Sequence, residues 1–90
     1  MGFIYMITSP SGKRYVGQTV GTVAERIKKH CKPYSKCKAI RDAIKKYKIE
    51  NFKIETLIQC NDSQLNDYEK LFIAHYDTFG KNGYNLTKGG

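Results

Sequence analysis

The chain has 90 residues, of which 40% are hydrophobic, and this size and composition suit one compact domain over residues 1–90 with a modest core. Sixteen Lys and Arg against eight Asp and Glu give a formal net charge of +8, which attracts polyanions over long range. Nucleic acid is the first partner to consider, although a basic surface can also serve solubility alone. The sequence has neither an apolar run of about 18 residues nor a secretory signal, which argues against a membrane protein and predicts an intracellular one.

Three cysteines, Cys31, Cys37 and Cys60, are spaced irregularly. An odd number of cysteines fits neither a framework of paired disulfides nor the CxxC pairs of a zinc site. His30 next to Cys31 could suggest a metal cluster, but apolar filler or reduced surface thiols explain these residues better.

The start of the chain predicts a β-hairpin. Residues 3–8 are rich in β-branched and aromatic side chains, the stretch around Pro10 has turn chemistry, and residues 14–17 return to an extended pattern. A turn centred near Pro10 would set Tyr5 roughly opposite Tyr15, with both rings on the same face of the hairpin.

Two helices are expected next. Thr22 and Glu25 have the spacing of a capping box, so a helix should start there and run until just before Lys32-Pro33, which ends it. Apolar side chains at three- and four-residue steps then predict a second helix around residues 40–47.

The rest of the chain predicts one strand and one helix. Residues 52–59 alternate apolar and polar side chains, as in a strand with one polar face, and capping side chains at residues 61–63 precede a helix that ends before Gly80. The glycine-punctuated tail, residues 82–90, is expected to be a short strand or loop. The order β-β-α-α-β-α predicts an α/β or α+β sandwich, with a small, mostly antiparallel three-stranded sheet flanked by three helices.

Glu69 breaks the packing pattern of the third predicted helix. A rotation of about 100° per residue places its carboxylate inside an apolar stripe that includes Leu65, Ile73 and Tyr76. Burying a carboxylate costs several kcal/mol unless the group is paired, hydrogen-bonded or bound to a metal. Glu69 could therefore form a salt bridge with a nearby Arg or Lys, or it could bind a metal, and the sequence alone allows both explanations.

Arg26 and His30 lie one turn apart along one edge of the buried face of the first helix. Each alone has an ordinary explanation, as a solvated arginine or a partly buried structural histidine. A cross-strand pair of Tyr5 and Tyr15 is likewise most often plain packing. The shared placement of Arg26 and His30 beside the sheet favours a functional role.

Together these residues form a known pattern. Phe3-Ile4-Tyr5 followed by Tyr15-Val16-Gly17 resembles the paired motif that names the GIY-YIG nuclease family, with Phe3 where the first glycine would stand. The resemblance continues through Arg26-x-x-x-His30, Glu69 and the Asn85 of Gly83-Tyr84-Asn85-Leu86, so it covers Phe3 to Asn85. Gln18-Thr19 and the final seven residues are similar to the phage, intron-homing and viral branch rather than the excision-repair branch.

By that resemblance, Glu69 is the single ligand of a divalent metal, Arg26 stabilises the phosphorane-like charge, and Tyr5 helps to activate the nucleophilic water. The residues that complete the site by hydrogen bonds are Tyr15, His30 and Asn85. Mg²⁺ suits one carboxylate because it keeps several waters, and Mn²⁺ can substitute. A tyrosine with a pKa near 10 can act as base only if nearby positive charge lowers that pKa, and His30 is the alternative base.

The resemblance implies a metal-dependent DNA endonuclease domain; the alternative is a basic, non-catalytic nucleic-acid-binding module of the same fold. A protein-interaction adaptor ranks last, because it gives no reason for Glu69 on an apolar stripe. The basic residues expected to contact DNA lie in the first turn and the first two helices: Lys13, Arg14, Lys28, Lys29, Arg41 and Lys45. The sequence shows no separate reader domain, so specificity is expected from a homodimer, DNA shape, a partner or a further domain of a longer protein.

Overall fold

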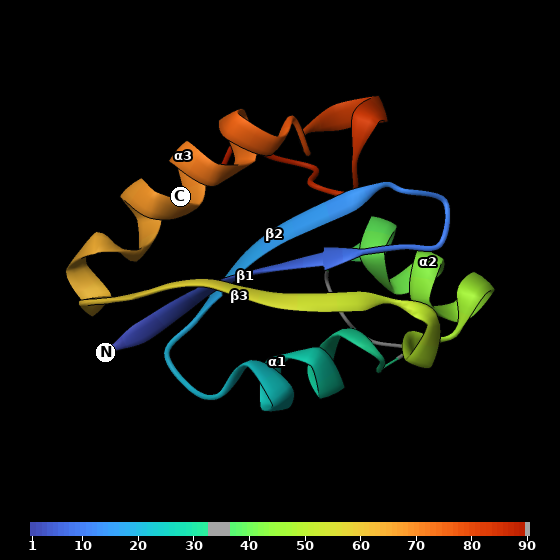
Figure 1. Cartoon of the computed structure of the whole chain (residues 1–90), viewed down its shortest axis with the longest axis horizontal. Coiled ribbons are helices and arrows are strands. Elements are labelled where there is room, and N and C mark those ends of the chain that lie inside the picture. The colour runs from blue at the N-terminus through green and yellow to red at the C-terminus, as the bar shows by residue number, and fades with distance from the viewer. Residues whose placement is uncertain (33–36, 90) are drawn as a thin grey trace.

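The computed structural model describes residues 1–32 and 37–89. In chain order the main elements are β1 (Gly2–Thr8), β2 (Arg14–Thr19), α1 (Val23–His30), α2 (Lys38–Tyr47), β3 (Lys53–Cys60) and α3 (Leu65–Tyr76). Three short 3₁₀ turns accompany them: η1 (Ile49–Asn51), η2 (Asp62–Gln64) and η3 (Gly80–Asn82). This order confirms the predicted β-β-α-α-β-α arrangement of an α+β fold (Figure 1). Within the described ranges, every helix is too short or too polar to cross a membrane.

The sheet is antiparallel and has the strand order β2-β1-β3, so β1 is central and the other two strands are edges. Alternation along β1 sends its side chains to two separate cores. Ile4 and Met6 pack with residues of α3, whereas Tyr5 and Ile7 pack with residues of α1 and α2. In Figure 1, α3 covers one face of the sheet, and α1 and α2 lie on the other.

The register of the hairpin differs from the sequence prediction. Tyr5 pairs with Gly17 rather than with Tyr15, because the turn is centred around Ser11 instead of Pro10. The prediction that Tyr5 lies opposite Tyr15 was therefore wrong. The two tyrosines still share a face of the sheet, since a shift of two residues preserves strand parity.

A β-bulge in β3 also departs from the predicted alternation. Ile4 pairs with Ile58, but the next residue, Tyr5, pairs with Thr56, so Leu57 is the extra residue. The bulge divides the residues that were expected to share one face. Ile58 packs with the α3 side of the sheet, while Ile54 is 42% exposed.

The first helix begins where the sequence predicts. The Thr22 side chain accepts a hydrogen bond from the Glu25 amide at 3.1 Å. The Glu25 carboxylate accepts from the Thr22 hydroxyl at 2.9 Å rather than from the Thr22 amide, so only half of the predicted capping box forms. The predicted helix stop at Pro33 lies outside the described residues.

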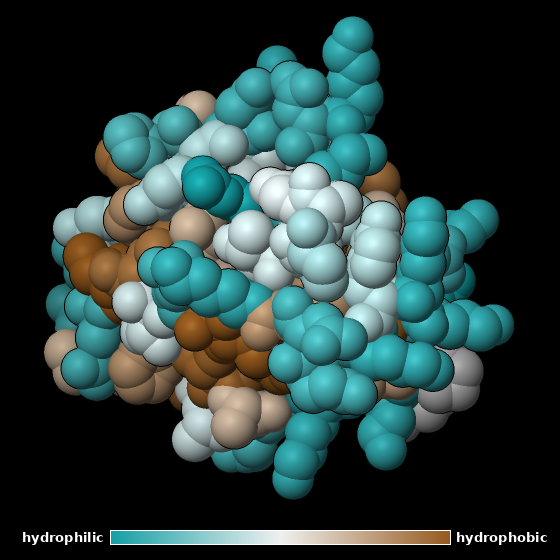
Figure 2. Space-filling model, turned by 45° about the vertical axis from the view of Figure 1, so that its right-hand side comes forward, coloured by the Kyte–Doolittle hydropathy of each residue, from teal (hydrophilic) through white to brown (hydrophobic). Residues whose placement is uncertain are grey.

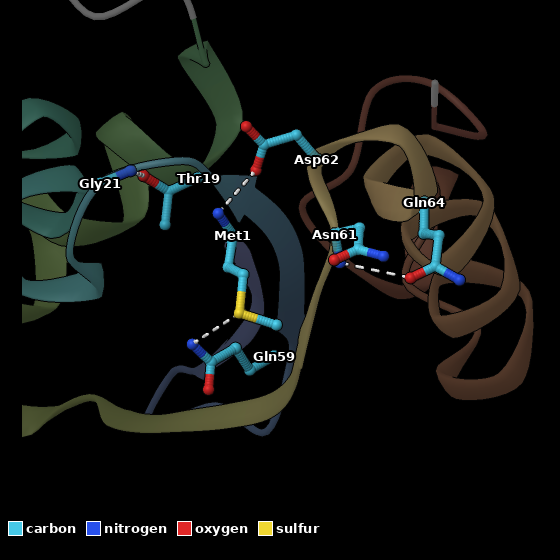
Figure 3. A network of polar contacts seen from close by, with 7 residues as sticks. All are labelled: Met1, Thr19, Gly21, Gln59, Asn61, Asp62 and Gln64. Carbon is cyan, nitrogen blue, oxygen red and sulfur yellow. Dashed lines mark hydrogen bonds and ion pairs between the residues drawn. The ribbon is translucent and has the colours of Figure 1, made fainter.

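Polar contacts tie the start of β1 to the junction between β3 and α3 (Figure 3). The amino group of Met1 lies 3.4 Å from the Asp62 carboxylate, and Gln59 Nε2 donates to Met1 Sδ at 3.7 Å. The predicted capping side chains close the η2 turn, where Gln64 Oε1 accepts from the Asn61 amide at 3.2 Å. The third helix therefore starts from a fixed turn at this end of the sheet.

The C-terminal segment docks on the edge strand β2. The Tyr84 amide donates to the Arg14 carbonyl at 2.9 Å, and the Asn85 side chain bonds the backbone N–H and carbonyl of Val16 at 2.9 and 2.8 Å. One parallel bridge joins Phe79 and Asn85 within a tail that is otherwise loop and 3₁₀ turn. These bonds satisfy backbone groups at an edge of the sheet that the strand order leaves open.

Candidate active site

Tyr5, on the central strand, lies at the middle of the candidate site and is fully buried. Its ring and hydroxyl pass directly over Gly17 of β2, where a Cβ atom would collide with the Tyr5 hydroxyl and with the Tyr15 ring. Glycine is thus required after Tyr15-Val16 because any side chain would occupy the place of the phenol. The open position lets the Tyr5 hydroxyl reach across the edge strand.

His30, the last residue of α1, contacts that hydroxyl. Its ring is 1% exposed, and Nε2 lies 2.7 Å from the Tyr5 hydroxyl oxygen. The edge of the ring also packs on Tyr15, with centroids 5.1 Å apart. Burial, with a smaller effect from the charge of Arg26, lowers the pKa of His30 to about 4, so the imidazole is neutral near pH 7. Its Nδ1 has no hydrogen-bond partner among the described residues.

Arg26 stands one turn before His30 on α1 and is half-buried. Burial raises the pKa of Tyr5 above its ordinary value of 10, although the charge of Arg26 and a side-chain hydrogen bond from it act in the opposite direction. Arg26 therefore acts as the sequence suggested, but burial dominates and Tyr5 is a neutral phenol. The Arg26 Nε is buried without a partner among the described residues, and an anion would supply the missing acceptor.

Tyr15 lines the same core, with its ring centroid 6.4 Å from that of Tyr5. Its hydroxyl lies 3.4 Å from Sγ of Cys37, at the start of α2, and burial raises the pKa of Tyr15. Sequence reasoning missed Cys37 and treated it as filler or a surface thiol. No spacing signal could have found this contact, because it joins residues 22 positions apart.

Glu69 approaches from α3, on the other side of the sheet. Leu65 and Ile73, one turn away on either side, are buried and Glu69 is half-buried, as the helical spacing predicts. Its charge contributes to raising the pKa of Tyr5, so the carboxylate lies within electrostatic reach of the phenol. Arg26 on α1 and Glu69 on α3 thus act on the pKa of Tyr5 in opposite directions.

The donor set fits a hard cation better than zinc. In the part of the chain that the structure describes, no group of three or more His, Cys, Asp or Glu could hold a metal ion. A cation at Glu69 would take one carboxylate from the protein and its other oxygens from water and phosphate. Mg²⁺ accepts such coordination, whereas zinc sites take three or four protein ligands.

Asn85 is 6% exposed, and both ends of its side-chain amide are bonded to the backbone of Val16. Val16 stands between Tyr15 and Gly17, the two residues of β2 that shape the space around the Tyr5 ring. These contacts make Asn85 a positioning residue that fixes the edge strand.

The six basic residues predicted to contact DNA are spread over both sides of the molecule. Four of them lie on α1 and α2: Lys28, Lys29, Arg41 and Lys45. The Arg41 Nε lies 3.5 Å from the Asp42 carboxylate. Lys13 is exposed in the hairpin turn, but the neighbouring Arg14 guanidinium lies 5.5 Å from the centre of the Tyr76 ring of α3.

Comparison with known proteins identifies the class of domain. The family model described as the GIY-YIG catalytic domain matches residues 1–85, and the chain belongs to this family of nuclease catalytic domains. Its structure is similar to that of the catalytic domain of the homing endonuclease I-TevI, with a TM-score of 0.75 and 21% sequence identity over 97% of this chain and 99% of that chain. A comparison with curated proteins gives no match.

Proposed function

We propose that the chain is a divalent-metal-dependent DNA endonuclease domain that hydrolyses phosphodiester bonds. The observation that carries this function is the buried contact of the Tyr5 hydroxyl with His30 Nε2 at 2.7 Å, with Arg26 one turn earlier on α1 acting on the pKa of the same phenol. Family membership supplies the reaction class. Hydrolysis of a phosphodiester needs charge neutralisation and proton transfer, and the side chains of the candidate site supply groups for both.

Arg26 binds the scissile phosphate. Its buried Nε needs an acceptor, and a planar guanidinium suits two phosphate oxygens better than an ammonium does. Glu69 holds the cation, which when bound supplies a second positive charge at the phosphate. Both charges stabilise the transition state more than the ground state, because negative charge builds up on the phosphoryl oxygens as the water attacks.

Tyr5 and His30 carry the proton of the attacking water. In this relay neutral His30 accepts through Nε2 from the Tyr5 hydroxyl, 2.7 Å away, and the Tyr5 oxygen accepts the proton of the water. The water forms its bond to phosphorus as its proton passes to the Tyr5 oxygen, and the Tyr5 hydrogen moves to His30. The bond from phosphorus to the leaving oxygen breaks in the same displacement.

The two pKa shifts bear differently on this relay. A free phenolate is never formed, so the raised pKa of Tyr5 does not oppose the transfer. The lowered pKa of His30 keeps its nitrogen unprotonated at neutral pH and favours later release of the proton, but it also makes His30 a weaker proton acceptor, so the transfer depends on the negative charge of the attacked phosphate to stabilise the imidazolium.

The test is conversion of supercoiled plasmid in Mg²⁺ or EDTA by the wild type, by Glu69→Gln and by Asp67→Asn. Asp67 is an exposed residue of the same helix, so its variant makes the same chemical change away from the site. We expect metal-dependent nicking or linearisation by the wild type and Asp67→Asn, and a loss of about 100-fold or more in Glu69→Gln with its fold and DNA binding retained. DNA binding without metal-dependent cleavage would instead make the chain a non-catalytic module. Wild-type cleavage by Glu69→Gln would remove Glu69 as the metal ligand.

A further inference from the structure

A groove of about 320 Å³ lies between the β1–β2 turn and α2, and the proposed chemistry does not use it. Its polar and aromatic lining comes from three segments of the chain: Ser11, Lys13, Asp42, Lys46, Tyr47 and Tyr84. Ammonium and hydroxyl groups predominate among these side chains, so the groove is rich in hydrogen-bond donors.

The hydroxyl groups of Tyr84, Ser9 and Ser11 form a short chain that ends at the groove, and one of its two hydrogen-bonding arrangements leaves the Ser11 hydrogen for a ligand. Tyr84 donates to Ser9 Oγ at 2.8 Å, and Ser9 Oγ lies 2.7 Å from Ser11 Oγ. Ser9 is 4% exposed and has only one hydroxyl hydrogen, which it can give to Ser11. The Ser11 hydroxyl could then donate within the protein only to the Tyr84 oxygen, 3.5 Å away, which is the limit for a hydrogen bond. A ligand oxygen in the groove would be a better acceptor for this hydrogen.

The charge of the groove is positive. The ion pairs found within the described residues do not involve Lys13 or Lys46. Lys46 Nζ lies 5.1 Å from the centre of the Tyr47 ring, which holds the ammonium at the groove wall. The single carboxylate of the lining, Asp42, is balanced in part by Arg41 at 3.5 Å.

The groove adjoins the candidate active site through Tyr84. A second hollow, of about 180 Å³, is lined by Tyr15, Cys37, Asn85 and Tyr84 among others. Tyr84 also lines the groove, so a chain that passes Tyr15 can continue past Tyr84 into it. A polyanion with regularly spaced phosphates could contact both places at once.

We propose that this groove binds a backbone phosphate of the cleaved DNA strand, next to the scissile phosphate. Lys13, Lys46 and the Ser11 hydroxyl are its donors, and these groups contact phosphate without reading the bases. The identity of the strand rests on the proposed nuclease function. The binding of a phosphodiester in the groove can be measured without cleavage.

The first experiment compares two charge-matched double variants in EDTA, with duplex DNA over a series of salt concentrations. Lys13→Ala/Lys46→Ala removes both ammonium groups of the groove, whereas Lys70→Ala/Lys81→Ala removes two exposed ones from α3 and η3. Loss of this one phosphate contact should reduce the slope of log K against log salt by about 1 and weaken binding by about 10-fold near 0.1 M salt. The control should change the slope by less than half as much. Equal effects of the two variants would overturn the site and leave only general attraction.

The second experiment places one uncharged methylphosphonate at successive positions along the DNA. Wild-type binding in EDTA should weaken at the position that contacts the groove, and Lys13→Ala/Lys46→Ala should show no further loss there. The same loss in both proteins at every position would show that the groove contacts no phosphate. An inactive wild type that passes both binding experiments would refute the nuclease proposal alone, and an active one that fails them would refute the groove alone.

Discussion

The two faces of the sheet are built for different purposes. On the face covered by α3, the core consists of apolar side chains such as Ile4, Met6 and Ile73. On the opposite face, the alternate positions of β1 and β2 place Tyr5 and Tyr15 in a core with residues of α1 and α2, the helices that lie on that side of the sheet in Figure 1. Of the three buried polar atoms without partners among the described residues, Arg26 Nε and His30 Nδ1 belong to α1, and Thr78 Oγ1 lies just after α3. The contrast teaches that the face under α1 and α2 gives up some stability to keep polar groups ready for a ligand, whereas the α3 face is mainly apolar and supplies Glu69 as an exception.

Charge follows the same division. Thirteen of the 16 Lys and Arg, with three of the eight Asp and Glu, fall within residues 13–53, which include α1 and α2. Residues 54–90, which include α3, contain the other three basic residues and five acidic ones. Figure 2 shows long hydrophilic side chains projecting from the molecule and hydrophobic residues exposed between them. A polyanion should therefore approach from the side of α1 and α2.

The largest effect is expected from Arg26→Lys, on the polar face. This variant keeps the charge but loses the planar fork, so we expect cleavage to fall by about 100- to 1000-fold while the fold is retained. Arg41→Lys, the same change at a predicted DNA contact on α2, should have a much smaller effect, because an ammonium still neutralises a phosphate and Arg41 lies outside the candidate active site. Cleavage rates and urea unfolding of both variants provide the measurement. Near-normal turnover of Arg26→Lys would reduce Arg26 to a general positive charge.

A change on the apolar face should affect stability instead. Ile73 is 2% exposed under α3, and Ile73→Ala should lower the free energy of unfolding by about 3 kcal/mol. Below its unfolding transition, the folded protein should still cleave within about threefold of the wild-type rate. If circular dichroism shows that the protein is folded but cleavage falls as much as in Arg26→Lys, the α3 face would be needed for catalysis as well as for stability.

The same comparison shows which features the sequence could predict. All six helices and strands follow from local patterns, and Glu69 was found because a carboxylate interrupted an apolar stripe. The bulge at Leu57 and the pairing of Tyr5 with Gly17 depend on how strands meet, which no local pattern records. The bond from Tyr5 to His30 joins residues 25 positions apart through the space above Gly17, so only the folded structure could show it.

A smaller effect is expected from pH. The pKa of His30 is about 4 in the folded protein and 6.5 in the unfolded chain, so the unfolded chain binds more protons between these values. The contribution of neutral His30 is present above pH 6.5 and is lost as the pH falls toward 4, by about 2 kcal/mol between pH 7 and pH 5. Urea unfolding at these two pH values should show a smaller pH dependence in His30→Gln. The same dependence in both proteins would contradict the burial of a neutral imidazole.

The most direct test of the proposed site is a double-mutant cycle of Tyr5→Phe and His30→Gln, measured as Mg²⁺-dependent cleavage rates of the folded proteins. If the Tyr5 hydroxyl and His30 pass one proton along their 2.7 Å contact, either change should cost about 100-fold or more, and the double variant should be no slower than the worse single one. A Tyr5→Phe protein that cleaves at the wild-type rate, or two losses that simply multiply, would contradict the relay.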